Sequence, residues 1–173
     1  MASLAPSPVG SPRVSPETTS PPRSTVVLLL ASLRPEQWTK NLVLFAALAF
    51  SKHLFETGPL SRALVAFSIF CGLSGAVYLL NDVADRERDR MHPLKRLRPV
   101  ASGTLSPRTA VGLAVLIGFG CLAASFVLGV PFAACAVLYL GLNLLYSFSL
   151  KEVVILDVLA ISMGFVLRAV AGA

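Results

Sequence analysis

One acidic stretch holds the side chains best suited to chemistry: Asn81, Asp82, Asp85 and Asp89. On a helix, Asn81, Asp85 and Asp89 are spaced i, i+4 and i+8, and Asp82 precedes the second aspartate by three residues. All four side chains then share one broad face. Carboxylate and amide oxygens suit Mg2+, which proteins usually hold through one or two carboxylates and the phosphates of a substrate. The stretch predicts a Mg2+ site made by these four residues, with the three aspartates catalytic.

A second interpretation of this stretch stays open. Arginines alternate with the acids between residues 82 and 90. Acid and arginine side chains three or four residues apart commonly form ion pairs on exposed helices. The same residues would then be a solvated helix end with no ligand.

Several cations are expected on the same side of the molecule as the acids. A substrate with several phosphates needs arginine, which can contact two oxygens at once, or lysine, which acts as a point charge. Arg34 could contribute to such a polyanion site, and the predicted phosphate-binding residues are Lys40, Lys95, Arg96, Arg98 and Lys151. The preference of cytoplasmic loops for Lys and Arg would alone explain the cations of residues 95–98.

Two ionisable residues fall inside the last apolar segment, Asp157 and Arg168. Charge is costly within a membrane, and such residues usually face the interior of a helix bundle or a wet cavity. Eleven residues separate them, or about 16 Å along a helix, so they cannot pair with each other. We predict supporting roles inside the membrane for both, and the sequence does not identify the partner of the arginine.

The elements that must position these residues are apolar helices. Hydrophobic residues make up 55% of the chain, charged residues 14%, and the mean hydropathy is +0.74, values typical of a membrane protein. A membrane-spanning helix needs about 20 apolar residues. Three of five apolar segments approach this length, while the first is interrupted at residues 34–40 and the fourth is short. The five segments are residues 26–51, 60–80, 109–128, 131–146 and 153–173. The sequence predicts an all-α, multi-pass transmembrane bundle.

The chain divides into two parts. Residues 1–24 are rich in proline and serine, a composition that predicts a disordered tail, and residues 25–173 form the transmembrane domain. The distribution of Lys and Arg places the N-terminus, the loop after the second segment and the loop around Lys151 in the cytoplasm. A basic loop beside anionic lipid explains the net charge of +6, so we expect no nucleic-acid partner.

Residues 81–89 resemble the first aspartate-rich motif, Asn-Asp-x-x-Asp-x-x-x-Asp, of the UbiA superfamily of membrane prenyltransferases. Residues 34–41, 89–103 and 146–168 are similar to the branch that makes polyprenyl-phosphoryl phosphoribose. The resemblance implies a bundle of nine transmembrane helices, of which about five are present here. It also implies a second aspartate-rich motif, joined to the first through Mg2+ and a diphosphate. That motif is absent, so we expect this chain to be an N-terminal part, inactive alone.

The resemblance implies Mg2+-dependent transfer of 5-phosphoribose from phosphoribosyl diphosphate to a polyprenyl phosphate similar to decaprenyl phosphate. The reaction would occur at the cytoplasmic face of the cell membrane and supply precursors of cell-envelope arabinan. One alternative is prenyl transfer from an isoprenoid diphosphate to an aromatic or haem-like acceptor. Its candidate residues are aromatic: Phe67, Phe70, Tyr78, Phe119, Phe126, Tyr139, Tyr146 and Phe148. Another alternative is a non-catalytic membrane protein that binds anionic lipid.

Overall fold

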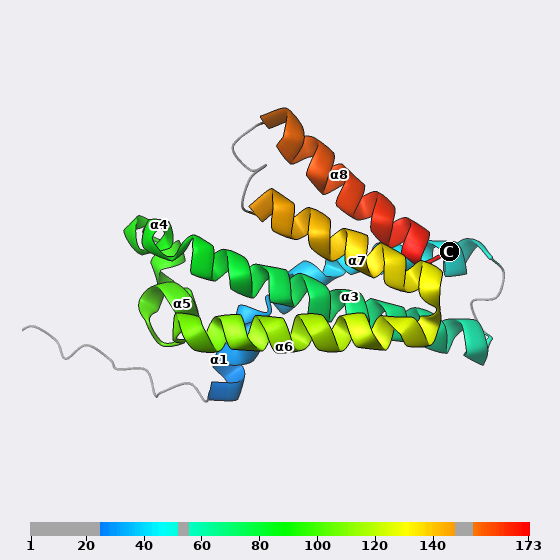
Figure 1. Ribbon diagram of the computed structural model, residues 1–173, viewed down its shortest axis with the longest axis horizontal. Helices are drawn as coiled ribbons and strands as arrows, with labels where there is room; N and C mark the ends of the chain where they lie inside the picture. The colour runs from blue at the N-terminus through cyan, green and yellow to red at the C-terminus, as the bar shows by residue number, and fades with distance from the viewer. Residues whose placement is uncertain (1–24, 52–55, 148–153) are drawn as a thin grey trace, which may run out of the picture.

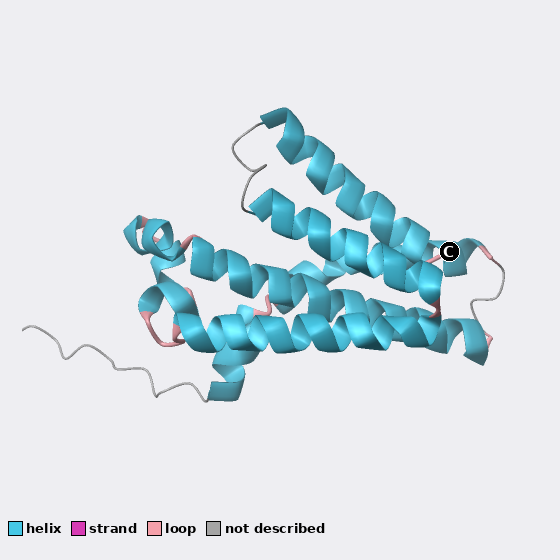
Figure 2. Cartoon of the chain, in the orientation of Figure 1, coloured by secondary structure: helices cyan, strands magenta, loops and turns pink. Residues whose placement is uncertain are grey.

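The computed structural model describes residues 25–51, 56–147 and 154–173. The predicted tail and Lys151 lie outside these ranges. Within them every regular element is a helix, which confirms the all-α prediction (Figure 2). The elements are α1 (Thr25–Ser32), η1 (Pro35–Phe45), α2 (Ala46–Phe50), α3 (Thr57–Ala84), α4 (Arg86–Met91), η2 (Lys95–Leu97), α5 (Pro99–Ser102), α6 (Pro107–Ser125), η3 (Phe126–Leu128), α7 (Val130–Leu145) and α8 (Val154–Ala171).

The two longest helices, α3 and α6, run antiparallel side by side (Figure 1). The 28 residues of α3 span about 42 Å, and Pro107–Leu128, comprising α6 and η3, is also long and apolar enough to cross a membrane. Small residues allow the two helices to approach closely, since a Cβ added at Gly72 would lie 2.4 Å from the Cys121 sulfur. Such close packing is typical of helices in membranes.

The first apolar segment does not form one continuous helix, as the interruption at residues 34–40 predicted. The helix α1 ends before Arg34, which adopts a left-handed conformation with φ of 51°, and Pro35 begins η1. Proline has no N–H to donate and therefore cannot continue the preceding helix. The segment continues through 11 residues of 3-10 helix in η1, and α2 follows directly.

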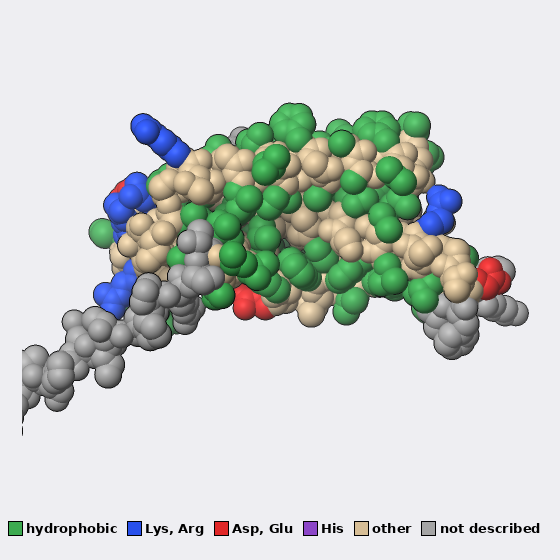
Figure 3. Space-filling view, turned by 90° about the horizontal axis from the view of Figure 1, so that it is seen from below, with side chains coloured by type: hydrophobic (Ala, Val, Ile, Leu, Met, Phe, Trp, Pro, Cys, Tyr) green, Lys and Arg blue, Asp and Glu red, His purple; other side chains and the backbone are tan. Residues whose placement is uncertain are grey.

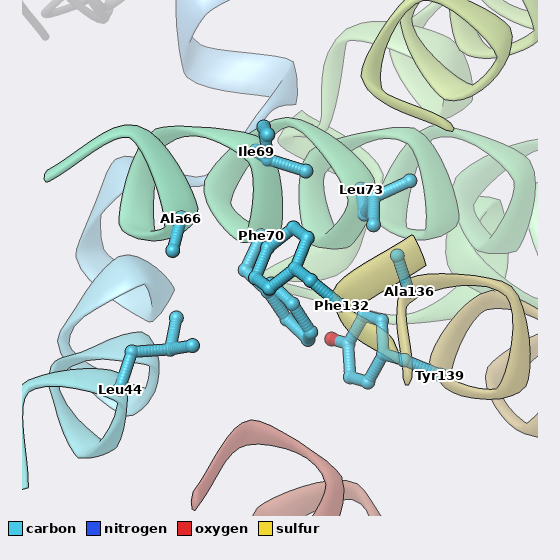
Figure 4. Close-up of a cluster of buried hydrophobic side chains, with 8 residues drawn as sticks. All are labelled: Leu44, Ala66, Ile69, Phe70, Leu73, Phe132, Ala136 and Tyr139. Atoms are coloured by element: carbon cyan, nitrogen blue, oxygen red, sulfur yellow. The ribbon is translucent and has the colours of Figure 1, made fainter. Parts of the chain in front are cut away.

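The helices α7 and α8 form a second pair that packs beside α3, and one cluster of buried side chains joins the two pairs (Figure 4). Phe70 of α3 lies at its centre, with ring centroids 5.7 Å from Phe132 and 5.0 Å from Tyr139 of α7. Leu44 of η1 belongs to the same cluster and is fully buried. This packing fixes η1, α3 and α7 relative to one another.

Candidate functional site

The acidic motif lies where α3 meets α4, at the end of the molecule opposite the α3 N-terminus (Figure 1). The expected single helix is interrupted there, because α3 ends at Ala84 and α4 begins at Arg86. Asp85 lies between them with φ of −92° and ψ of 6°. Helix-like hydrogen bonds nevertheless continue from the Asp85 N–H to the Asn81 carbonyl and from the Asp89 N–H to the Asp85 carbonyl, both 2.8 Å.

Asp82 is buried, with 2% of its surface exposed, and arginines from two separate segments neutralise it. Arg34, between α1 and η1, donates from Nη2 to Asp82 Oδ1, and its guanidinium lies 4.9 Å from the centre of the Tyr78 ring. Arg98, between η2 and α5, donates from Nη1 to the same oxygen at 3.4 Å. Both arginines are distant in sequence from this carboxylate.

Arg98 also holds the last aspartate of the motif. Asp89 is 2% exposed, and its Oδ2 accepts a 2.5 Å hydrogen bond from Arg98 Nη1. One guanidinium thus joins the two buried carboxylates. Together with Arg34 they form a compact cluster of two negative and two positive charges, the arrangement that allows charged groups to be buried.

The other two motif residues point elsewhere. The Asn81 Oδ1 accepts a hydrogen bond from the Ser147 hydroxyl, and Asp85 is partly exposed, 3.8 Å from Arg88 Nη1. Among the described residues, no three His, Cys, Asp or Glu side chains are grouped so that they could hold a metal ion. The Mg2+ site remains a prediction. The exposed-pair interpretation fits Asp85 but does not account for the buried aspartates.

A cavity of about 230 Å3 opens among η1, α3, α7 and α8. Its lining combines polar, aromatic and apolar side chains: Lys40, Ser74, Val77, Tyr78, Asn81, Tyr139, Leu142, Asn143, Tyr146, Ala160, Ile161, Gly164, Phe165 and Arg168. Asn81 connects the acidic motif to this cavity. Lys40 and Arg168 are two cations that line it.

The cavity reveals the partners of Arg168, which the sequence did not identify. Its Nε donates to Asn41 Oδ1 and its Nη2 to the Tyr139 hydroxyl, both at 2.8 Å. Asn41 is fully buried and also donates toward Ser74. Sequence reasoning did not assign Asn41 to the site, although a buried amide in an apolar segment is itself a signal of function.

The remaining predicted cations are spread out. Lys95 and Arg96 are exposed in η2, and Arg98 contacts carboxylates in place of the predicted phosphate. Lys151 lies outside the described residues, and so does the side chain of Asp157, whose backbone belongs to α8. Of the predicted phosphate-binding residues that are described, only Lys40 lines the cavity.

Known proteins resemble this chain over nearly its whole length. The UbiA prenyltransferase family matches residues 26–173. The decaprenyl-phosphate phosphoribosyltransferase of Mycolicibacterium smegmatis is 38% identical to this chain, over 90% of the chain and 50% of its own length. That of Mycobacterium tuberculosis is 37% identical, over 89% of the chain and 52% of its own length. The nodulation protein NoeC of Azorhizobium caulinodans is 35% identical over 81% of this chain and 45% of its own length. The chain thus spans about half the length of the curated relatives it matches, and it belongs to the UbiA prenyltransferase family of integral membrane proteins.

Proposed function

We propose that the protein transfers 5-phosphoribose from phosphoribosyl diphosphate to a polyprenyl phosphate, with Mg2+, at the cytoplasmic face of the cell membrane. The names of the two phosphoribosyltransferases above support this choice of donor and acceptor. Supply of cell-envelope arabinan precursors is part of the same proposal. The second aspartate-rich motif that such a reaction needs is expected in the part of the relatives that this chain does not span.

The observation that carries the proposal is the cavity shared by the motif and the cations. Asn81 of the acidic motif, Lys40 and Arg168 line one space. Two phosphorylated substrates must meet in such an enzyme, and cations are needed to hold both. A prenyl transfer to a neutral acceptor would bring one phosphorylated substrate and require fewer.

The donor set of the motif fits Mg2+ in its chemistry. Mg2+ prefers oxygen ligands. The motif supplies them from three carboxylates and one amide: Asp82, Asp85, Asp89 and Asn81. Bound Mg2+ would stabilise the negative charge that develops on the departing diphosphate. Arginines hold Asp82 Oδ1 and Asp89 Oδ2, so these two oxygens would become available to Mg2+ if Arg34 and Arg98 moved away, and the released guanidiniums could then contact phosphate.

The reaction itself requires little proton transfer. The bond between ribose C1 and the diphosphate oxygen breaks, the lipid phosphate oxygen forms a new bond to C1, and diphosphate leaves with the bonding electron pair. The lipid phosphate is already an anion and needs orientation more than a general base. Cations placed to stabilise the developing charge would supply most of the catalysis.

Asp85→Ala provides the test. Asp85 is partly exposed, so this change spares the buried ion pairs of Asp82 and Asp89. Full-length protein in membranes would receive phosphoribosyl diphosphate, Mg2+ and a polyprenyl phosphate, and the lipid product would be identified by its mass. We expect a phosphoribosyl lipid from the wild type and a fall in rate of about 100-fold or more in the variant, as for loss of a charge-stabilising group.

Glu87→Ala is the matched control, since Glu87 is an exposed acid in the same stretch that pairs with Arg90 at 3.2 Å. It should retain the wild-type rate. A wild-type protein that forms no phosphoribosyl lipid would refute the proposal. Equal losses of rate in Asp85→Ala and Glu87→Ala would contradict the assignment of a catalytic role to the acidic motif.

Prenyl transfer to an aromatic or haem-like acceptor is the second candidate. Three of its candidate aromatic residues, Tyr78, Tyr139 and Tyr146, line the cavity, whereas Phe119 and Phe126 are exposed on the outer surface. Phe148 lies outside the described residues. Prenylated product from an isoprenoid diphosphate in the same assay would favour this candidate. No turnover with either donor would favour the non-catalytic lipid-binding alternative.

A further inference from the structure

Arg168 is a buried cation whose described partners are all neutral. It is 7% exposed, donates to an amide oxygen of Asn41 and to the hydroxyl of Tyr139, and its guanidinium lies 4.8 Å and 5.3 Å from the centres of the Tyr139 and Phe165 rings. In the part of the chain that the structure describes, no carboxylate lies within ion-pair distance of it. The backbone of Asp157 lies about 16 Å from that of Arg168 along α8.

An isolated charge in an apolar interior is costly unless an opposite charge joins it. Ring faces and neutral oxygens offset part of that cost, and within membranes such residues typically mark the path of a substrate or ion. The two hydrogen bonds occupy two of the five N–H donors of an arginine. The others have no acceptor among the described residues, and the side chain lines the cavity.

The cavity matches a phosphate-sized anion with an apolar extension. Lys40 adds a second positive charge to its lining, while Leu142, Ile161 and Phe165 from α7 and α8 supply apolar contact. Its volume of about 230 Å3 falls below the roughly 300–1,000 Å3 of sites that enclose a whole drug-sized ligand. The space therefore suits a head group whose chain continues outside it.

We propose that this cavity is the binding subsite for the phosphate of the lipid substrate, with Arg168 and Lys40 as its cationic ligands. Asn41 and Tyr139 hold the guanidinium in position from η1 and α7. The first part of the prenyl chain contacts the apolar lining residues. The soluble diphosphate donor binds apart from Arg168, at the acidic motif. This subsite rests on the proposed function only for the identity of the lipid.

The experiment measures the binding of three probes to full-length protein in detergent: farnesyl phosphate, farnesol and phosphoribosyl diphosphate with Mg2+. We expect Arg168→Gln to weaken farnesyl phosphate binding by at least about tenfold, the effect of losing charged hydrogen bonds. Affinities for farnesol and for the diphosphate should stay within about twofold. Arg168→Lys, which keeps the charge, should recover part of the lost affinity.

Arg62→Gln is the matched control. Arg62 lies near the N-terminal end of α3, outside the part of the helix that lines the cavity, and it donates to the Leu128 carbonyl at 3.1 Å. It should bind all three probes as the wild type does. Unchanged farnesyl phosphate binding in a folded Arg168→Gln variant would overturn the subsite, and so would an equal loss for farnesol. A loss confined to the diphosphate would assign Arg168 to the donor and also overturn it.

If Arg168→Gln fails to fold, Arg168→Lys and Lys40→Gln carry the test. Both should weaken farnesyl phosphate binding without affecting farnesol, and unchanged binding in both would refute the subsite. The outcomes separate this inference from the proposed reaction. Arg168-dependent binding of farnesyl phosphate without phosphoribosyl transfer would leave the subsite standing and remove the reaction.

Discussion

Arg98 is the residue on which the geometry of the acidic motif depends. Its guanidinium contacts Asp82 at 3.4 Å and Asp89 at 2.5 Å, and both carboxylates have only 3% of their side-chain surface exposed. Arg34 shares the first of them, whereas Arg98 is the only cation within ion-pair distance of Asp89 among the described residues. Loss of Arg98 would leave a buried negative charge without its partner.

Arg98→Gln should therefore lower the free energy of unfolding by about 3 kcal/mol, the scale measured when one partner of a buried pair is removed. Arg88→Gln is the matched control, because Arg88 is 73% exposed and lies 3.8 Å from Asp85. An exposed pair contributes about 0–1 kcal/mol. Denaturant unfolding in detergent measures both, and similar values for the two variants would contradict the structural role of Arg98.

The same variant tests whether the motif binds metal. A guanidinium on Asp89 competes with a cation for the carboxylate, so Arg98→Gln should bind Mn2+ more tightly than the wild type when no diphosphate is present. The spectrum of free Mn2+ in electron paramagnetic resonance reports the bound fraction. Equal affinities would mean that Arg98 does not compete with the metal for Asp82 or Asp89.

Sequence reasoning could identify the acids but not their partners. Rules for helices relate residues three or four apart, which correctly indicates the exposed Asp85–Arg88 pair. Arg34 is 48 residues from Asp82, and Arg168 is 127 residues from Asn41. Such contacts depend on how the helices pack, and a single sequence does not contain that information in its local pattern.

Among the helices, the packing of α3 against α6 depends on small residues where the two helices meet. A Cβ at Gly72 would lie 2.4 Å from the Cys121 sulfur, closer than real Cβ contacts allow. The two helices must separate slightly or the cysteine must move if this glycine is enlarged. Long apolar runs in the sequence were sufficient to predict α3, α6, α7 and α8, but this close packing of α3 on α6 was not predicted.

Gly72→Ala should lower the free energy of unfolding by about 1–3 kcal/mol through overpacking. Adding Cys121→Ala removes the sulfur and should restore most of the loss. Gly120→Ala is the control, since an added Cβ there meets nothing within 4 Å and the alanine should stabilise α6 by up to about 1 kcal/mol. A double variant no more stable than Gly72→Ala would show that the sulfur is not the obstacle.

One face of the molecule is largely apolar along its middle. Hydrophobic side chains are spread over the middle of this face in Figure 3, an acidic patch lies at its lower edge, and Lys and Arg side chains lie toward its two ends. Large residues such as Leu116, Phe119 and Val127 on α6 and η3 are more than 70% exposed. Together with the family membership, this surface agrees with a bundle that contacts lipid.

The predicted orientation places η2 in the cytoplasm and the start of α3 on the other side. In a cysteine-free full-length protein, Lys95→Cys should react with a membrane-impermeant maleimide only in inverted vesicles. Thr57→Cys should react only in intact cells, because Thr57 is the exposed first residue of α3, ahead of the predicted span of residues 60–80 and at the opposite end of α3 from α4 (Figure 1). Reaction of both from the same side would show that α3 does not cross the membrane, and the reverse pattern would invert the topology.

The 3-10 conformation makes η1 longer than an α-helix with the same number of residues. A 3-10 helix rises about 2.0 Å per residue and an α-helix about 1.5 Å, so the 11 residues of η1 extend about 22 Å instead of about 16 Å. The segment starts beside Arg34 at the carboxylates and carries Asn41 down to Arg168 in α8. The extended conformation of η1 therefore sets the distance between the acidic motif and the buried Arg168 guanidinium. If η1 were an α-helix, these two parts of the site would lie closer together.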